Sequence, residues 1–128
     1  MITLKTLPDT TAQEVFDQAA EHLLRQNAKS VEFEVEKNAG CTARCMYRGI
    51  NGKKCVAGCF ISDEEYNPNW EACAWEDLVN ADSVPSNHEE LISRLQYLHD
   101  SKQVDRWKEE LKVIAQAFNL ETIILEKF

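Results

Sequence analysis

Three stretches of the chain, residues 11–27, 86–101 and 103–118, repeat hydrophobic residues at steps of three and four. This is the period of an α-helix with one buried face. The sequence therefore predicts three long helices, the last two of which form a helical hairpin, and a shorter helix around residues 75–80. The predicted buried residues are Val15, Phe16, Ala19, Leu23, Leu24, Trp75, Leu78, Val79, Leu91, Ile92, Leu95, Leu98, Val104, Trp107, Leu111, Ile114 and Phe118.

Other stretches have the pattern of β-strands. Residues 30–36 alternate valine and phenylalanine with glutamate, a strict period of two that predicts a half-exposed strand. Residues 1–7 alternate in the same way over a shorter length, and residues 121–128 are rich in β-branched and aromatic side chains. The two ends of the chain are therefore predicted to pair as strands.

Gly49-Ile50-Asn51-Gly52 lies between two short runs and predicts the turn of a central β-hairpin, because Asn-Gly readily adopts positive φ angles. The arms of this hairpin are residues 44–48 and 53–56. The expected fold class is α+β, with about four helices packed on a small, mostly antiparallel sheet. A chain of 128 residues predicts a single domain, 1–128.

Composition places the chain among ordinary globular proteins, with 44% hydrophobic and 28% charged residues. The first 15 residues lack the basic and then apolar pattern of a signal peptide, and no apolar run reaches the ~18 residues of a membrane helix. We therefore expect a cytoplasmic protein that does not associate with membranes. In a reducing compartment, its five cysteines are expected to be free thiols or metal ligands rather than disulfides.

The net charge of −8 is distributed unevenly. Residues 25–54 carry seven bases and three acids, whereas residues 55–93 carry nine acids and no lysine or arginine. Proteins that coat nucleic acid need a basic footprint, so direct binding to nucleic acid is not expected. An acidic surface suits a basic protein partner, or imitates nucleic acid toward one, although the same charge can serve solubility alone.

Aromatic side chains interrupt this acidic run. Tyrosine and tryptophan beside carboxylates are a common composition for a surface that docks on a basic protein. The predicted contact residues are Asp63, Glu64, Glu65, Tyr66, Trp70 and Glu71.

Four of the five cysteines form two pairs with three residues inside each pair. Zinc in structural sites prefers four such ligands in a tetrahedron, so the pairs predict a zinc site at Cys41, Cys45, Cys55 and Cys59. Most zinc ribbons place two residues between paired ligands. Free cysteine also packs in protein interiors as a small apolar side chain, and that alternative stays open.

Two catalytic or ligand-binding alternatives involve the same stretch. Cys55 or Cys45 would act as a nucleophile if Arg48, Lys53 or Lys54 lowered its pKa and His88 or His99 served as the base. Residues 48–54 would bind a phosphate if the turn amides and the three cations faced one anion, although Walker spacing is lacking.

The run Cys45–Cys55 has the pattern C-x-Y-R-G-x-x-G-x-K-C. Together with residues 56–66, 91–100 and the opening 6–24, it resembles a family of small uncharacterised proteins of tailed phages and prophages. The resemblance implies nothing about mechanism, because that family has no activity that can be carried over to this chain. The extra cysteines Cys41 and Cys73 and the longer strand-like ending depart from that family's pattern, and the departure at Cys41 weakens a zinc site common to the family.

The resemblance implies a small phage protein that acts without catalysis by binding a host protein with a basic surface. Host takeover or anti-defence is the expected setting, in the cytoplasm of the host cell. A zinc-stabilised four-cysteine module and a thiol-dependent enzyme are the alternatives.

Overall fold

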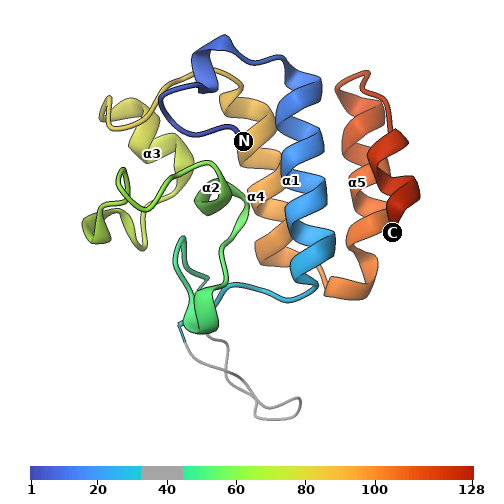
Figure 1. The fold of residues 1–128 in the computed structure, drawn as a ribbon, viewed down its shortest axis with the longest axis horizontal. Coiled ribbons are helices and arrows are strands. Elements are labelled where there is room, and N and C mark those ends of the chain that lie inside the picture. The colour runs from blue at the N-terminus through green and yellow to red at the C-terminus, as the bar shows by residue number, and fades with distance from the viewer. Residues whose placement is uncertain (33–44) are drawn as a thin grey trace.

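The computed structural model describes residues 1–32 and 45–128, and these residues form a helical protein (Figure 1). Single turns of 3-10 helix precede, connect and follow the α-helices. The α-helices are α1 (Ala12–Gln26), α2 (Val56–Cys59), α3 (Trp75–Asn80), α4 (Glu89–Ser101) and α5 (Trp107–Ala117). The structure thus confirms the three long helices and the short helix at residues 75–80 that the sequence pattern predicts.

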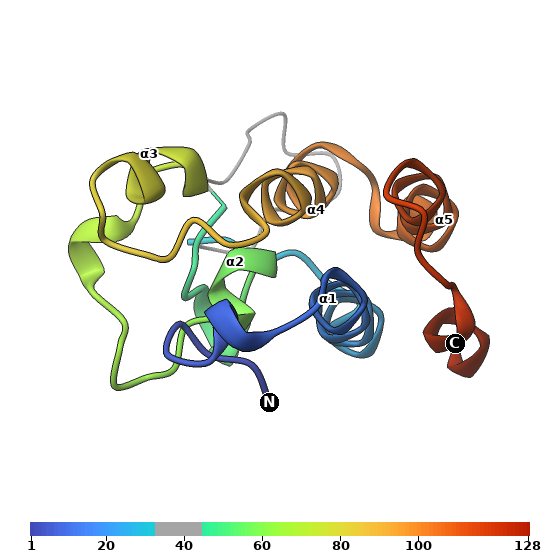
Figure 2. The ribbon, with the colours of Figure 1, turned by 90° about the horizontal axis from the view of Figure 1, so that it is seen from above.

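Helices α1 and α4 occupy the middle of the molecule, with α5 on one side and α2 and α3 on the other (Figure 2). Helix α4 packs against the four other helices, and α5 folds back on it as the predicted helical hairpin. Helix α1 begins with a capping box, in which Thr11 and Glu14 satisfy each other's backbone N–H groups. It ends at Asn27 in the left-handed conformation, with φ of 50°.

The core is a single cluster to which all five α-helices contribute buried side chains. Phe16, Ile92, Leu95 and Trp107 are among its fully buried side chains. All predicted core residues of α3 and α4 are buried, whereas Leu24, Val104 and Phe118 are only half-buried at the edge of the core.

The predicted α+β fold, with a small antiparallel sheet and a central hairpin, is wrong. In residues 1–32 and 45–128 there is no strand, only an isolated antiparallel bridge between Val31 and Cys45. The rest of the predicted strand at 30–36 lies outside the described residues. Residues 1–7 turn into a 3-10 helix at Leu7–Asp9, and residues 121–128 form another at Ile123–Lys127.

Glutamine side chains of α1 form the backbone hydrogen bonds that the two chain ends were expected to form with each other as strands. Gln18 accepts from the N–H of Ile2 at 2.7 Å and donates to its carbonyl at 3.0 Å. Gln13 makes the same pair of bonds to Glu121, at 2.8 and 3.1 Å. A carboxamide has the same donor and acceptor as a peptide group. Both chain ends therefore form backbone hydrogen bonds with side chains of α1 and not with each other.

The predicted turn of the hairpin forms, but the hydrogen bonds between two extended arms do not. Asn51 and Gly52 adopt φ angles of 56° and 73°, as the Asn-Gly pair predicts. Beyond the turn, the backbone of Lys54 pairs in both directions with the side chain of Gln26, at 2.9 and 2.8 Å. The following residues begin α2, so the second arm has no extended stretch to pair with the first.

Candidate functional site

The six predicted contact residues lie in the irregular chain between α2 and α3. Asp63 and Glu64 are exposed, and the other four are half-buried. Asp63 receives the guanidinium of Arg48 at 3.2 Å, while its own side chain is 87% exposed. Such an exposed ion pair contributes little to stability. Asp63 and Glu64 are therefore the members of this group whose charge faces solvent.

Glu65 holds the N-terminal segment in place. One carboxylate oxygen accepts from the N–H groups of Leu4 and Ser62, at 3.2 and 2.9 Å, and the other accepts from Lys5 at 3.1 Å. Burial acts to raise the pKa of Glu65, but these hydrogen bonds outweigh it and lower the pKa below its ordinary value. The carboxylate of Glu65 therefore stabilises the fold by accepting hydrogen bonds from backbone N–H groups.

Replacing Glu65 with glutamine should lower the free energy of unfolding at pH 7 by about 1 kcal/mol or less, since the side chain is only half-buried and solvent screens its charge. A carboxylate whose pKa is lowered by folding stabilises the protein above its unfolded pKa, and this contribution is lost as the pH falls through the folded pKa. The difference between the wild type and Glu65→Gln should therefore shrink from pH 7 to pH 3. Urea unfolding at both pH values measures it.

Glu64→Gln is the matched control for this prediction, because Glu64 is exposed and forms no hydrogen bond among the described residues. It should leave the pH dependence unchanged. A Glu65→Gln variant whose stability difference stays constant over this range would contradict the assignment.

Glu71 joins three parts of the chain. Its carboxylate accepts from the N–H groups of Tyr47 and Arg48, at 2.9 and 3.1 Å, and from the hydroxyl of Tyr66 at 2.6 Å. Burial and this bond to Glu71 raise the pKa of Tyr66 to about 12. The guanidinium of Arg48 lies 4.9 Å from the centre of the Tyr66 ring. Glu71 and Tyr66 thus act inside the fold rather than as a bare contact surface.

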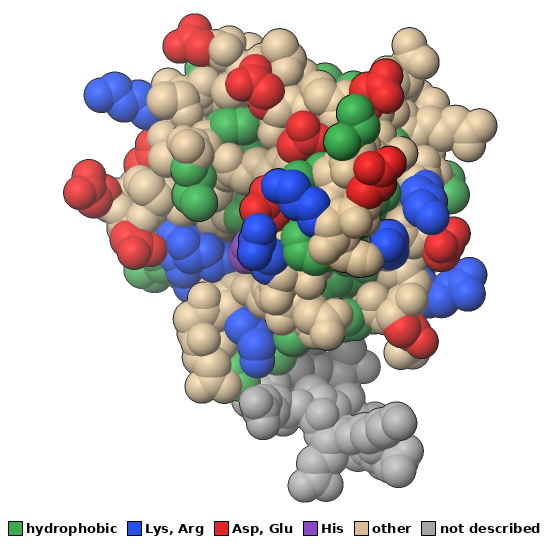
Figure 3. Space-filling model, turned by 45° about the vertical axis from the view of Figure 1, so that its right-hand side comes forward, with side chains coloured by type: hydrophobic (Ala, Val, Ile, Leu, Met, Phe, Trp, Pro, Cys, Tyr) green, Lys and Arg blue, Asp and Glu red, His purple; other side chains and the backbone are tan. Residues whose placement is uncertain are grey.

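The acidic run still supplies an exposed group of carboxylates, which we call the acidic set. Its members are Asp63, Glu64, Glu76, Asp77, Asp82 and Glu90. By contrast, the face of the molecule toward α5 mixes lysine and arginine with aspartate and glutamate (Figure 3). The charge asymmetry of the sequence therefore persists at the surface.

A cluster that the sequence did not predict lies where α4 ends. Cys45, His99 and Asp100 bring a sulfur, an imidazole nitrogen and a carboxylate oxygen within 4.8 Å of one another. His99 is fully buried and stacks on Trp107, with ring centres 5.6 Å apart. Its Nε2 accepts from the N–H of Ser30 at 3.0 Å, and its Nδ1 lies 2.8 Å from Asp100 Oδ1.

The Ser30 amide decides the protonation of this ring. Because Nε2 accepts a hydrogen bond, the neutral ring carries its proton on Nδ1 and donates it to Asp100. Both nitrogens of His99 are therefore in use. The ring offers no free lone pair to a metal or to a thiol, so His99 works as a structural link between the Ser30 segment and the end of α4.

The predicted zinc ligands are not gathered in the described part of the chain. Cys55 is buried at the start of α2, where its sulfur accepts from the N–H of Gly58 at 3.4 Å. Cys59 is half-buried at the end of the same helix, and Cys45 faces Asp100 rather than either of them. Among residues 1–32 and 45–128, Cys45, His99 and Asp100 are the one group with metal-ligand spacing. Cys41 lies outside the described residues, so the four-cysteine site stays a prediction.

The surroundings of the cysteines do not favour a nucleophile. Burial and the neighbouring Asp100 raise the pKa of Cys45 to about 11, and burial raises the pKa of Cys59 to about 12. Burial also raises the pKa of Cys55. Two of the cations expected to activate a thiolate are engaged elsewhere: Arg48 donates to the carbonyls of Gly58 and Ile61, and the ammonium of Lys54 lies 4.0 Å from Asp63. His88, the other predicted base, is bonded to the carbonyl of Thr10 at 2.8 Å.

At neutral pH, Cys45, Cys55 and Cys59 should react with iodoacetamide at least about tenfold more slowly in the native protein than in urea. Their raised pKa values leave almost no thiolate, and the greater nucleophilicity of a high-pKa thiol offsets only part of this. The rate at Cys45 should rise steeply toward pH 11. Peptide mass spectrometry measures each site separately. Rapid native labelling of one of these three cysteines at pH 7 would restore the thiol-enzyme alternative.

Hydrogen bonds within the fold occupy three backbone N–H groups at the turn of residues 49–52. The N–H groups of Gly49, Ile50 and Lys53 all donate to backbone carbonyls, at 2.8, 3.0 and 3.2 Å. Bound anions at turns rely on unpaired amides. The N–H groups of Gly49, Ile50 and Lys53 are therefore not available to a phosphate.

A cleft of about 200 Å³ opens beside Cys45 and Asp100, between the start of α3 and the second half of α4. Its wall includes Trp75, Ser93, Gln96 and Tyr97. A larger open groove of about 1140 Å³ runs between α1 and the turn at residues 49–52. Its lining includes Glu14, Asp17, Glu21 and Arg25 of α1, and Lys53 and Lys54 after the turn. The groove mixes both signs of charge, whereas the described residues that line the cleft include carboxylates and no lysine or arginine.

Comparison with known proteins gives no relative for this chain: no family model, no curated protein and no solved structure matches it. The similarity to phage and prophage proteins therefore stays a resemblance of sequence pattern. Within the described residues, no helix combines the length and the apolar character needed to cross a membrane.

Proposed function

We propose that this chain is a non-catalytic phage-type protein that binds a basic host protein through the acidic set. The observation that carries the proposal is the run of residues 55–93, which has nine carboxylates and no lysine or arginine. Six of these carboxylates are exposed. Complementary charge of this kind steers association and selects partners.

The structure changes which residues are proposed to make contact. Glu65, Tyr66 and Glu71 hold the fold together, so their loss would act on stability first. Asp77 accepts from the N–H of Ala74 at the start of α3. Glu64, Glu76 and Asp82 are exposed, and their carboxylates form no hydrogen bond or ion pair among the described residues, which makes them the members to test.

Binding is favoured over thiol catalysis by the raised thiol pKa values and by the hydrogen bonds that occupy both nitrogens of His99. A reactive cysteine needs a lowered pKa and a base within reach. The zinc-stabilised module is the remaining alternative, and elemental analysis of the purified protein discriminates it.

The experiment compares two triple variants in capture of proteins from a bacterial extract. The test variant is Glu64→Gln, Glu76→Gln and Asp82→Asn. Each removed surface charge is worth up to about 1 kcal/mol, so the test variant should bind a basic partner about tenfold more weakly. Capture by the wild type should also fall as salt is raised, because salt screens exposed charges.

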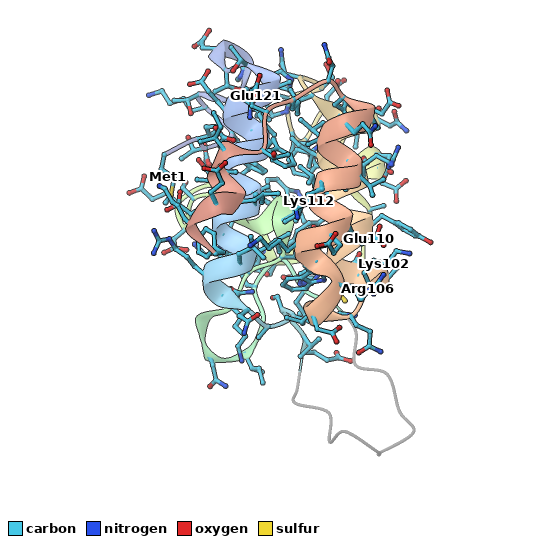
Figure 4. The ribbon with its side chains drawn as sticks, turned by 90° about the vertical axis from the view of Figure 1, so that its right-hand side faces the viewer. Met1, Lys102, Arg106, Glu110, Lys112 and Glu121 are labelled. Carbon is cyan, nitrogen blue, oxygen red and sulfur yellow. The ribbon has the colours of Figure 1, made fainter. Side chains whose placement is uncertain are left out.

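The matched control is Asp105→Asn, Glu121→Gln and Glu126→Gln, which changes the net charge equally at exposed positions outside the acidic run. This side of the molecule carries both signs of charge, as the labelled Lys102, Arg106, Glu110 and Lys112 show (Figure 4). The control should bind as the wild type does. Equal loss of binding in both variants would reduce the effect to net charge and contradict a specific acidic surface.

A further inference from the structure

We draw no further inference here: the strongest candidate, the open groove between α1 and the turn at residues 49–52, carries both signs of charge along its lining, and nothing in the described part of the structure shows what covers it.

Discussion

Replacing Gly58 with alanine is expected to lower the free energy of unfolding by about 3 kcal/mol, the upper end of the usual cost of overpacking. A Cβ at this position would overlap the carbonyl oxygen of Tyr47 and come within 3.1 Å of its carbonyl carbon. Both are backbone atoms, so no side chain can rotate away to relieve the contact. Helix α2 would have to move from the 45–48 segment, and urea unfolding measures the cost.

Gly52→Ala is the control for this prediction. Gly52 has a φ of 73°, and a Cβ there meets no atom within 4 Å. Its cost is the backbone strain of alanine in the left-handed region, about 1 kcal/mol. Similar losses in both variants would show that close approach of α2 to Tyr47 is not what requires glycine at position 58.

His99→Leu should destabilise the protein by about 3 kcal/mol. Leucine fills a similar space against Trp107 but leaves the buried N–H of Ser30 without an acceptor and removes the bond to Asp100. Thermal or urea unfolding measures the loss. Hydrogen exchange at the Ser30 amide adds a local readout, since this amide should lose its protection at denaturant concentrations where α1 keeps its own.

Asp100→Asn is the companion variant. An asparagine keeps an oxygen for the Nδ1–H of His99 while removing the charge, so its cost should stay below about 1 kcal/mol. If His99→Leu were no more harmful than Asp100→Asn, the link from Ser30 through His99 to α4 would not be a principal stabilising contact.

The sequence offers His99 only as a candidate base for a cysteine nucleophile, whereas the structure buries it in the core. The position of His99 in the helical repeat predicts its burial better than its polar character does. His99 lies four residues after Leu95 and seven after Ile92, and both of these are fully buried. A histidine in that register is placed in the core, where its two nitrogens need partners.

The predicted strands at the two chain ends and in the hairpin do not form, because alternation indicates which side chains can face a core and not what the backbone will pair with. The end segments 1–7 and 121–128 have suitable strand residues, yet Gln18 and Gln13 of α1 satisfy their backbone groups first. Gln26 does the same for Lys54 in the predicted hairpin. Nothing in the sequence distinguishes these glutamines from ordinary solvent-exposed residues on a helix.

The sequence by itself determined the long helices, the Asn51-Gly52 turn and the uneven charge, since each depends on residues close together along the chain. Tertiary structure alone decided which polar groups are exposed. The carboxylates of Glu65 and Glu71 accept hydrogen bonds from backbone N–H groups within the fold, whereas Glu76 stays exposed beside a cleft. Cys45 lies beside Asp100 rather than beside the other cysteines. The physical reason is that hydrogen-bond partners and burial come from segments distant in sequence, whose approach depends on the packing of the whole core.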